Sequence, residues 1–192
     1  MQCSLKILLP LAILAVPVVA LAQGQGRQFP SVGKPLSEAE IQSFDRMIGP
    51  EGKELPVGHG TSKEGAVIFA QRCEICHGKN GENGITHHLV AGAPGKPYKG
   101  PFYGPEKDGP SYFPYPTIAW DYINRAMPAP NPGSLKPNEV YALVAFLYYR
   151  NGIINENDEM NEKTLPKVVM PNRDGFIPAK PVYPPEKKPS WF

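Results

Sequence analysis

Cysteine is scarce in this sequence, with three in 192 residues, and two of the three stand close together. Cys3 lies in an N-terminal segment with the features of a cleaved export leader: a positive charge at Lys6, an apolar run, and an A-x-A site at residues 20–22. Cys3 precedes the apolar run, which is the wrong place for a lipoprotein anchor. We therefore expect residues 1–22 to be a signal peptide and the exported chain to keep only Cys73 and Cys76.

A long hydrophobic run and an excess of one charge are also absent. The apolar stretch from Ile7 to Val19 is short and interrupted by Pro10 and Pro17, so it is a poor membrane helix, and membrane attachment would require an uncleaved leader. Without Lys6, 19 Lys and Arg residues face 18 Asp and Glu residues, and no basic stripe points to nucleic acid. Cleavage would leave about 170 residues, enough for one hydrophobic core.

The chain does contain Cys73-Glu74-Ile75-Cys76-His77, the C-x-x-C-H pattern of covalent haem attachment. Two thiols at this spacing can form thioether bonds to one porphyrin, and the adjacent histidine then lies where its imidazole can bind the iron. A redox dithiol or half of a zinc site would use the same cysteines, and His87 and His88 could nominally complete a zinc site. The export leader and the histidine in the fifth position favour one covalent haem c bound by Cys73, Cys76 and His77.

Proline is abundant, with 24 residues, and it gathers outside four stretches that have helical periodicity. Helices are predicted at 37–49, from 61 or 62 to 73, at 117–126 and at 136–149. The first opens with a capping box formed by Ser37 and Glu40. The residues expected to face the core are Ile41, Phe44, Met47 and Ile48 on the first helix, and Ile118, Trp120 and Tyr122 on the third.

Gly65 and Phe69 lie four residues apart on the second helix and can form a seam for the fourth, which begins near Pro137 and stops at Asn151-Gly152. A helix before the cysteine motif and an aromatic helix that crosses it make the frame of class I cytochromes c. We therefore predict an all-α class I cytochrome c fold, with three to five helices around one haem. The expected parts are an N-terminal arm with a short helix at 23–60, the cytochrome domain at 61–155, and a C-terminal wrap with a proline-rich tail at 156–192.

The sixth iron ligand is a choice among methionines and histidines. Met127 precedes Pro128 in a proline-rich loop just ahead of the last helix, where class I cytochromes place their methionine, so we predict Met127 as the ligand. Met170 is also followed by proline but lies beyond the last helix, and it is the alternative distal ligand. His87 and His88 remain further candidates. Methionine would raise the reduction potential, and a second histidine would lower it.

Several segments resemble one group of cytochromes. The more specific ones are Asp121-Tyr122-Ile123 followed by Arg125-Ala126-Met127-Pro128, and Met170-Pro171-Asn172-Arg173-Asp174-Gly175-Phe176. They are similar to the c-type cytochrome subunits of sulfur-compound dehydrogenases, the SoxD-like and sulfite dehydrogenase cytochromes. The resemblance covers most of the chain, from residue 33 to residue 176.

This resemblance implies a periplasmic electron acceptor for a molybdenum-cofactor dehydrogenase that oxidises sulfite or sulfane sulfur. Electrons would then pass to a downstream cytochrome or oxidase of the respiratory chain. The molybdenum subunit would be a separate chain, because this one is too short to hold it. With His77 and Met127 both bound, the iron would have no open position, so we expect an electron-transfer subunit that is not itself an enzyme.

Other functions and roles stay open at this point. The chain could be a haem enzyme that acts directly on a sulfur compound such as thiosulfate, a docking subunit, or a general shuttle for another periplasmic dehydrogenase. Arg125 could pair with a haem propionate or face solvent. Arg173 and Asp174 are expected to hold the C-terminal segment through local hydrogen bonds.

Overall fold

The computed structural model of the protein describes residues 33–100, 102 and 109–177. The predicted signal peptide, the start of the N-terminal arm and the tail from residue 178 lie outside these residues. The helices are α1 (Glu38–Phe44), α2 (Ser62–Arg72), α3 (Glu74–His77), α4 (Thr117–Ala126) and α5 (Pro137–Arg150). The strands are β1 (His59–Thr61) and β2 (Glu159–Asn161), and the 3₁₀ turns are η1 (Lys79–Gly81), η2 (Pro110–Tyr112) and η3 (Leu165–Lys167).

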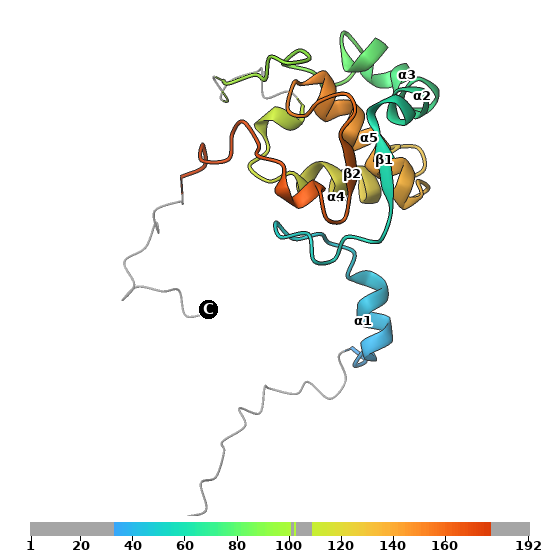
Figure 1. The fold of residues 1–192 in the computed structure, drawn as a ribbon. Coiled ribbons are helices and arrows are strands. Elements are labelled where there is room, and N and C mark those ends of the chain that lie inside the picture. Colours follow the sequence, from blue (N-terminus) through green and yellow to red (C-terminus); the bar gives the residue numbers. More distant parts are fainter. Residues whose placement is uncertain (1–32, 101, 103–108, 178–192) are drawn as a thin grey trace, which may run out of the picture. The chain divides into compact units, whose positions relative to one another are not determined.

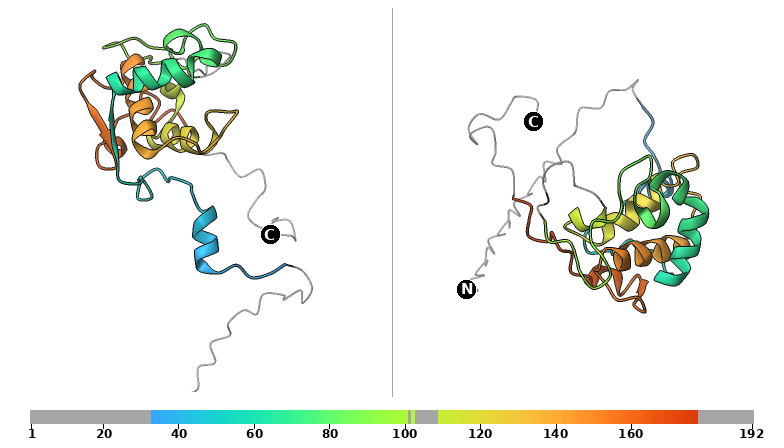
Figure 2. Two further views of the ribbon diagram at one scale, coloured as in Figure 1. Left: turned by 90° about the vertical axis from the view of Figure 1, so that its right-hand side faces the viewer. Right: turned by 90° about the horizontal axis from the view of Figure 1, so that it is seen from above.

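Helix α5 is the centre of the hydrophobic core, and every residue from Val140 to Tyr148 is buried. It packs against both α2 and α4, and it lies between them in Figures 1 and 2. Its tyrosines anchor the segments that enter the core. The Tyr141 hydroxyl donates to the carbonyl of Pro56 at 2.8 Å, and the Tyr148 hydroxyl donates to the carbonyl of Pro116 at 2.5 Å.

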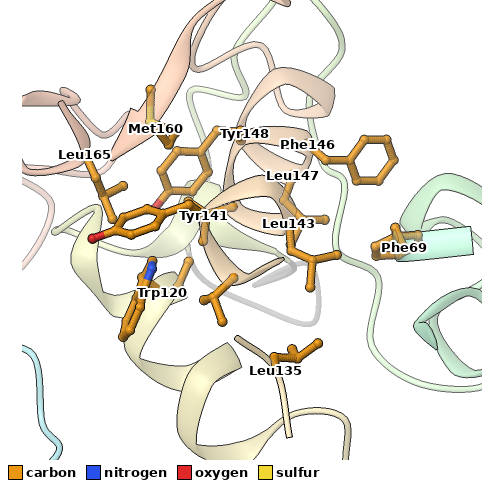
Figure 3. Packing of buried hydrophobic residues seen from close by; sticks show 14 of the residues in the cluster. Phe69, Trp120, Leu135, Tyr141, Leu143, Phe146, Leu147, Tyr148, Met160 and Leu165 are labelled. Atoms are coloured by element: carbon orange, nitrogen blue, oxygen red, sulfur yellow. The ribbon is translucent and has the colours of Figure 1, made fainter. Parts of the chain in front are cut away.

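Helix α2 crosses α5 at a glycine. A Cβ atom on Gly65 would lie 1.9 Å from the carbonyl oxygen of Ala142 and 2.7 Å from the Cβ atom of Phe146. Only glycine permits an approach this close. One turn further along α2, Phe69 packs against Phe146 with ring centroids 5.0 Å apart (Figure 3). The predicted seam of Gly65 and Phe69 is therefore confirmed.

Helix α4 has the predicted bounds but a different inward face. Trp120 is 1% exposed, and its ring lies 5.5 Å from that of Tyr141 (Figure 3). Tyr122, which we expected to face inward, is 53% exposed, and Ile118 is half-buried. Residues two apart lie about 200° apart around a helix, so burying Trp120 turns Tyr122 outward.

Helix α1 begins after Ser37 as predicted, but it ends at Phe44 and buries none of its residues. Phe44 and Met47 are exposed, so the expectation that they belong to the core is wrong, and Ile41 is exposed as well. Ile48 alone of the four packs against the core, and its backbone N–H donates to a carboxylate oxygen of Asp121 at 3.0 Å. Periodicity identifies an apolar face but not what covers it.

The two strands were not predicted, and they add a small antiparallel sheet to the otherwise helical fold. Gly60 pairs with Met160, so the sheet joins residues 59–61 to residues 159–161. Both strands pack against α5. Each strand has three residues, which is too short for an alternating pattern to show in the sequence.

Asn151 is a fully buried polar centre at the end of α5. Its Nδ2 group donates to the carbonyls of Leu89 and Leu147, each at 2.8 Å. Its Oδ1 atom accepts from the backbone N–H of Ala91 at 2.9 Å and from the Ser111 hydroxyl at 3.2 Å. This one side chain therefore fixes the loop after the cysteine motif to the central helix.

Candidate haem site

Cys73, Cys76 and His77 lie on a single turn of the chain. Cys73 separates α2 from α3, and its carbonyl accepts from the backbone N–H of Cys76 at 3.1 Å and of His77 at 3.0 Å. All three residues are half-buried. The structure therefore brings together the three residues that the C-x-x-C-H pattern predicted.

The chain then folds back onto this turn. A Cβ atom on Gly84 would lie 2.3 Å from the carbonyl oxygen of Cys76 and from the carbonyl carbon of His77, so the returning loop needs glycine there. Just beyond it, the backbone N–H of Thr86 donates to the carbonyl of Cys76 at 3.1 Å. The loop from residue 78 to residue 88 is thus closed against the cysteine motif.

The imidazole of His77 is held from this loop. Its Nδ1 atom lies 3.1 Å from the carbonyl oxygen of His87 and 3.0 Å from the hydroxyl oxygen of Thr86. A carbonyl oxygen only accepts, so Nδ1 carries the proton and donates it. The lone pair of this tautomer is on Nε2, which is the arrangement that metal-binding histidines adopt. His77 is therefore oriented as an iron ligand would be.

The two cysteines fit thioether formation better than redox or zinc chemistry. No disulfide joins them, and burial raises the pKa of the Cys73 thiol to about 11. Redox dithiols instead have a cysteine whose pKa is lowered. Within the described part of the chain, no three His, Cys, Asp or Glu side chains gather as a zinc site would need. His87 and His88 are both exposed.

Met127 follows α4 directly and is half-buried, and its backbone N–H closes the helix on the carbonyl of Ile123 at 3.2 Å. The loop that follows Met127 is tied to α2. The Arg72 guanidinium donates to the Ser134 hydroxyl at 2.9 Å and lies 3.8 Å from the carboxylate of Glu139. Arg72 immediately precedes Cys73, so the residue next to the cysteine motif holds the loop of the predicted distal methionine.

Met170, the alternative distal ligand, has a different environment. Its side chain is 2% exposed and belongs to the hydrophobic core. The neighbouring Asn172 donates to the carbonyl of Tyr112 at 2.7 Å and fixes the segment there. Because the residue is already packed in the core, we expect it to reach an iron less readily, and Met127 stays the predicted ligand.

The family described as "Cytochrome C oxidase, cbb3-type, subunit III" matches residues 60–147. The crystal structure of the sulfane dehydrogenase SoxCD from Paracoccus pantotrophus contains a similar chain, with 30% sequence identity and a TM-score of 0.67. The likeness covers 78% of this chain and 72% of that one.

The chain belongs to the c-type cytochromes. The class I cytochrome c fold is thereby confirmed, with the small sheet as an addition to the predicted helices. Haem c is the cofactor of this family, and the contacts of Cys73, Cys76 and His77 fit it. A comparison with curated protein sequences gave no match. Over the described ranges of the cytochrome, no helix has the length and apolar character needed to span a membrane.

Two predicted arginine roles have different outcomes. Arg125 forms an ion pair with Asp121 one turn earlier on α4, with its Nε atom 2.9 Å from the carboxylate, and it is exposed. Its pairing with a haem propionate stays a prediction. Arg173 donates its backbone N–H to the carbonyl of Met170 at 3.1 Å, a local hydrogen bond of the expected kind, and its guanidinium lies 4.3 Å from the ring centre of Tyr115 in a cation–π contact.

Sequence reasoning missed two residues beside the site, Thr86 and Arg72. Each acts through side-chain contacts to residues at least nine positions away, and neither lies in a recognisable motif. The charge of Arg72 at the end of α2 was the only available signal, and it did not reveal the partner.

Proposed function

We propose that this cytochrome is a periplasmic electron-transfer subunit that receives single electrons from a separate molybdenum-cofactor dehydrogenase of sulfite or sulfane sulfur. It would pass them to a downstream cytochrome or oxidase. One observation carries the proposal: the likeness to a chain of SoxCD covers 78% of the sequence and so extends well beyond the family match at residues 60–147. The likeness is therefore not confined to the stretch that matches the cytochrome family.

Each residue of the site would have a separate role in holding the haem. Cys73 and Cys76 would form the two thioether bonds, and the Nε2 atom of His77 would bind the iron on one side. Met127 would bind it on the other, from the loop that Arg72 holds. The haem supplies a one-electron carrier when it is bound. With His77 and Met127 both bound to the iron, no position would be left for a substrate, and no acid or base from the chain would be required.

Electron delivery from a dehydrogenase is the experiment that tests this function. The oxidised cytochrome is mixed with a candidate molybdenum dehydrogenase, and the optical spectrum is followed after sulfite, or a protein-bound sulfane, is added. We expect reduction at a rate set by the amount of dehydrogenase, and none when the dehydrogenase is omitted. A cytochrome that stays oxidised beside a dehydrogenase that reduces an artificial acceptor would contradict the proposal. Reduction by thiosulfate or sulfite without any dehydrogenase would instead support a haem enzyme.

The periplasmic location has its own test. Mass spectrometry of the protein recovered from the periplasmic fraction should give a mature N-terminus at Gln23, after the A-x-A site. An intact N-terminal methionine in a membrane fraction would show that the leader is retained.

A further inference from the structure

The Thr86 side chain contacts both the second cysteine and the histidine of the haem motif. Its backbone N–H and its hydroxyl both reach the carbonyl oxygen of Cys76, at 3.1 and 3.0 Å. The same hydroxyl oxygen lies 3.0 Å from Nδ1 of His77. Within the described residues, no other side chain forms a hydrogen bond with His77, whose second contact is the backbone carbonyl of His87.

These distances assign the direction of each hydrogen bond. A carbonyl oxygen cannot donate, so the Thr86 hydroxyl donates its proton to the carbonyl oxygen of Cys76. Its oxygen is then left to accept, and the proton on Nδ1 of His77 is shared between this hydroxyl and the carbonyl of His87. The Thr86 side chain therefore relays a hydrogen bond from the histidine to the backbone beside the second cysteine.

We propose that Thr86 is a positioning residue for the axial histidine, and that its hydroxyl lowers the reduction potential of the cytochrome by accepting from Nδ1 of His77. This inference rests on the proposed attachment of haem c with His77 as the iron ligand. An acceptor on Nδ1 makes the imidazole a stronger electron donor through Nε2, and a stronger donor stabilises oxidised iron more than reduced iron. A second acceptor adds to the effect of the His87 carbonyl.

The geometry separates this role from simple packing. Thr86 is exposed, so its side chain fills no core space. Val has almost the same shape but cannot accept a hydrogen bond, whereas Ser keeps the hydroxyl and loses only a methyl group. Ile85, the next residue in the chain, is 87% exposed and makes a matched control site.

The test is potentiometric titration of the haem-bearing protein with the variants Thr86→Val, Thr86→Ser and Ile85→Val. In Thr86→Val we expect the reduction equilibrium to shift toward the reduced form by about two- to tenfold, the range of one hydrogen bond. A tenfold shift is about 59 mV for one electron. Thr86→Ser and Ile85→Val should keep the parent potential. A parent potential in Thr86→Val, or an equal shift in Ile85→Val, overturns the proposal.

A second measurement needs no variant and so survives a failure of Thr86→Val to accumulate. In the reduced, ¹⁵N-labelled parent protein, a nuclear Overhauser cross-peak is expected between the Nδ1 proton of His77 and the methyl group of Thr86. Its absence overturns the placement. The outcome is independent of the proposed function: a cytochrome that accepts no electrons from a sulfur dehydrogenase can still show the shift, and a parent-like Thr86→Val can still accept them.

Discussion

At the scale of single residues, the buried side chain of Asn151 supplies hydrogen-bond partners to backbone groups of the loop after the haem motif. The Asn151→Ala variant would leave the carbonyl of Leu89 and the N–H of Ala91 without this partner, and both belong to the loop after the haem motif. Because each buried group left unpaired costs about 1–3 kcal/mol, we expect the free energy of unfolding to fall by about 3 kcal/mol or more. Guanidinium unfolding followed by circular dichroism measures it. Asn157→Ala, at an exposed position, should change stability by less than about 0.5 kcal/mol.

A substitution at Gly65 tests how closely α2 and α5 pack where they cross. The Gly65→Ala variant would place a methyl group 1.9 Å from the carbonyl oxygen of Ala142, so α2 and α5 must separate. Overpacking of this kind costs about 1–3 kcal/mol, and we expect the upper end because the nearest atoms belong to the backbone. Gln71→Ala, at an exposed position of the same helix, is the control for thermal unfolding. Equal midpoints for the two variants would mean that the crossing is looser than these distances show.

The two methionines are distinguished by different readouts. Met127→Ala should abolish the weak long-wavelength band of sulfur-to-iron coordination in the oxidised protein and leave the core intact. Met170→Ala should keep that band but lower the free energy of unfolding by about 2–5 kcal/mol, because it empties a fully buried site. Loss of the band in Met170→Ala alone would reverse the ligand assignment. Absence of the band in the parent protein would contradict methionine coordination and make His87 and His88 the candidate ligands.

At the scale of elements, the start of α2 has a complete capping box. The Glu64 carboxylate accepts from the Thr61 hydroxyl at 2.7 Å and from the Thr61 backbone N–H at 2.8 Å. These hydrogen bonds hold the pKa of Glu64 below its usual value, and the hydrogen bond from the Thr61 hydroxyl has the larger effect. Thr61→Ala should therefore lower the free energy of unfolding at pH 7 by about 1 kcal/mol, whereas Lys63→Ala in the same turn should not.

The capping box also gives stability a dependence on pH. Because the pKa of Glu64 is lower in the folded protein, its contribution is complete above the unfolded value, near 4.3, and is lost as the pH falls through the folded value. The stability difference between the parent and Thr61→Ala should accordingly be smaller at pH 3 than at pH 7. A difference that grows on acidification would contradict the assigned hydrogen bonds.

At the scale of the whole molecule, the elements that carry their own local signals were predictable. Helix α4 matches its predicted bounds, and the start of α2 at a Thr61 cap and the stop of α5 at Asn151 were also correct. Features that depend on contacts between different segments of the chain were not predictable. The pairing of Gly60 with Met160, the exposure of Phe44 and the contact of Thr86 with His77 each require knowledge of what lies opposite. The haem motif itself was predictable because its chemistry is contained in five consecutive residues.

The single C-x-x-C-H pattern predicts the electron capacity of the whole molecule. One motif in 192 residues allows one haem per chain. The pyridine haemochromogen assay should therefore give one haem per polypeptide, and a reductive titration should consume one electron. Consumption of two electrons per chain would contradict this prediction.

The pairing of β1 with β2 also imposes an order on assembly. In a chain synthesised from its N-terminus, residues 59–61 are made well before their partners, residues 159–161. Helix α2 is likewise made before Ala142 of α5, against which it packs. Contacts of such long sequence separation close late, because the loop between them must be ordered first. Cys73 and Cys76 follow β1 and α2 directly, so they remain on an unfinished scaffold while the rest of the chain appears. We therefore expect the thiols to be most accessible to a haem-attaching enzyme before α5 and β2 complete the fold around them.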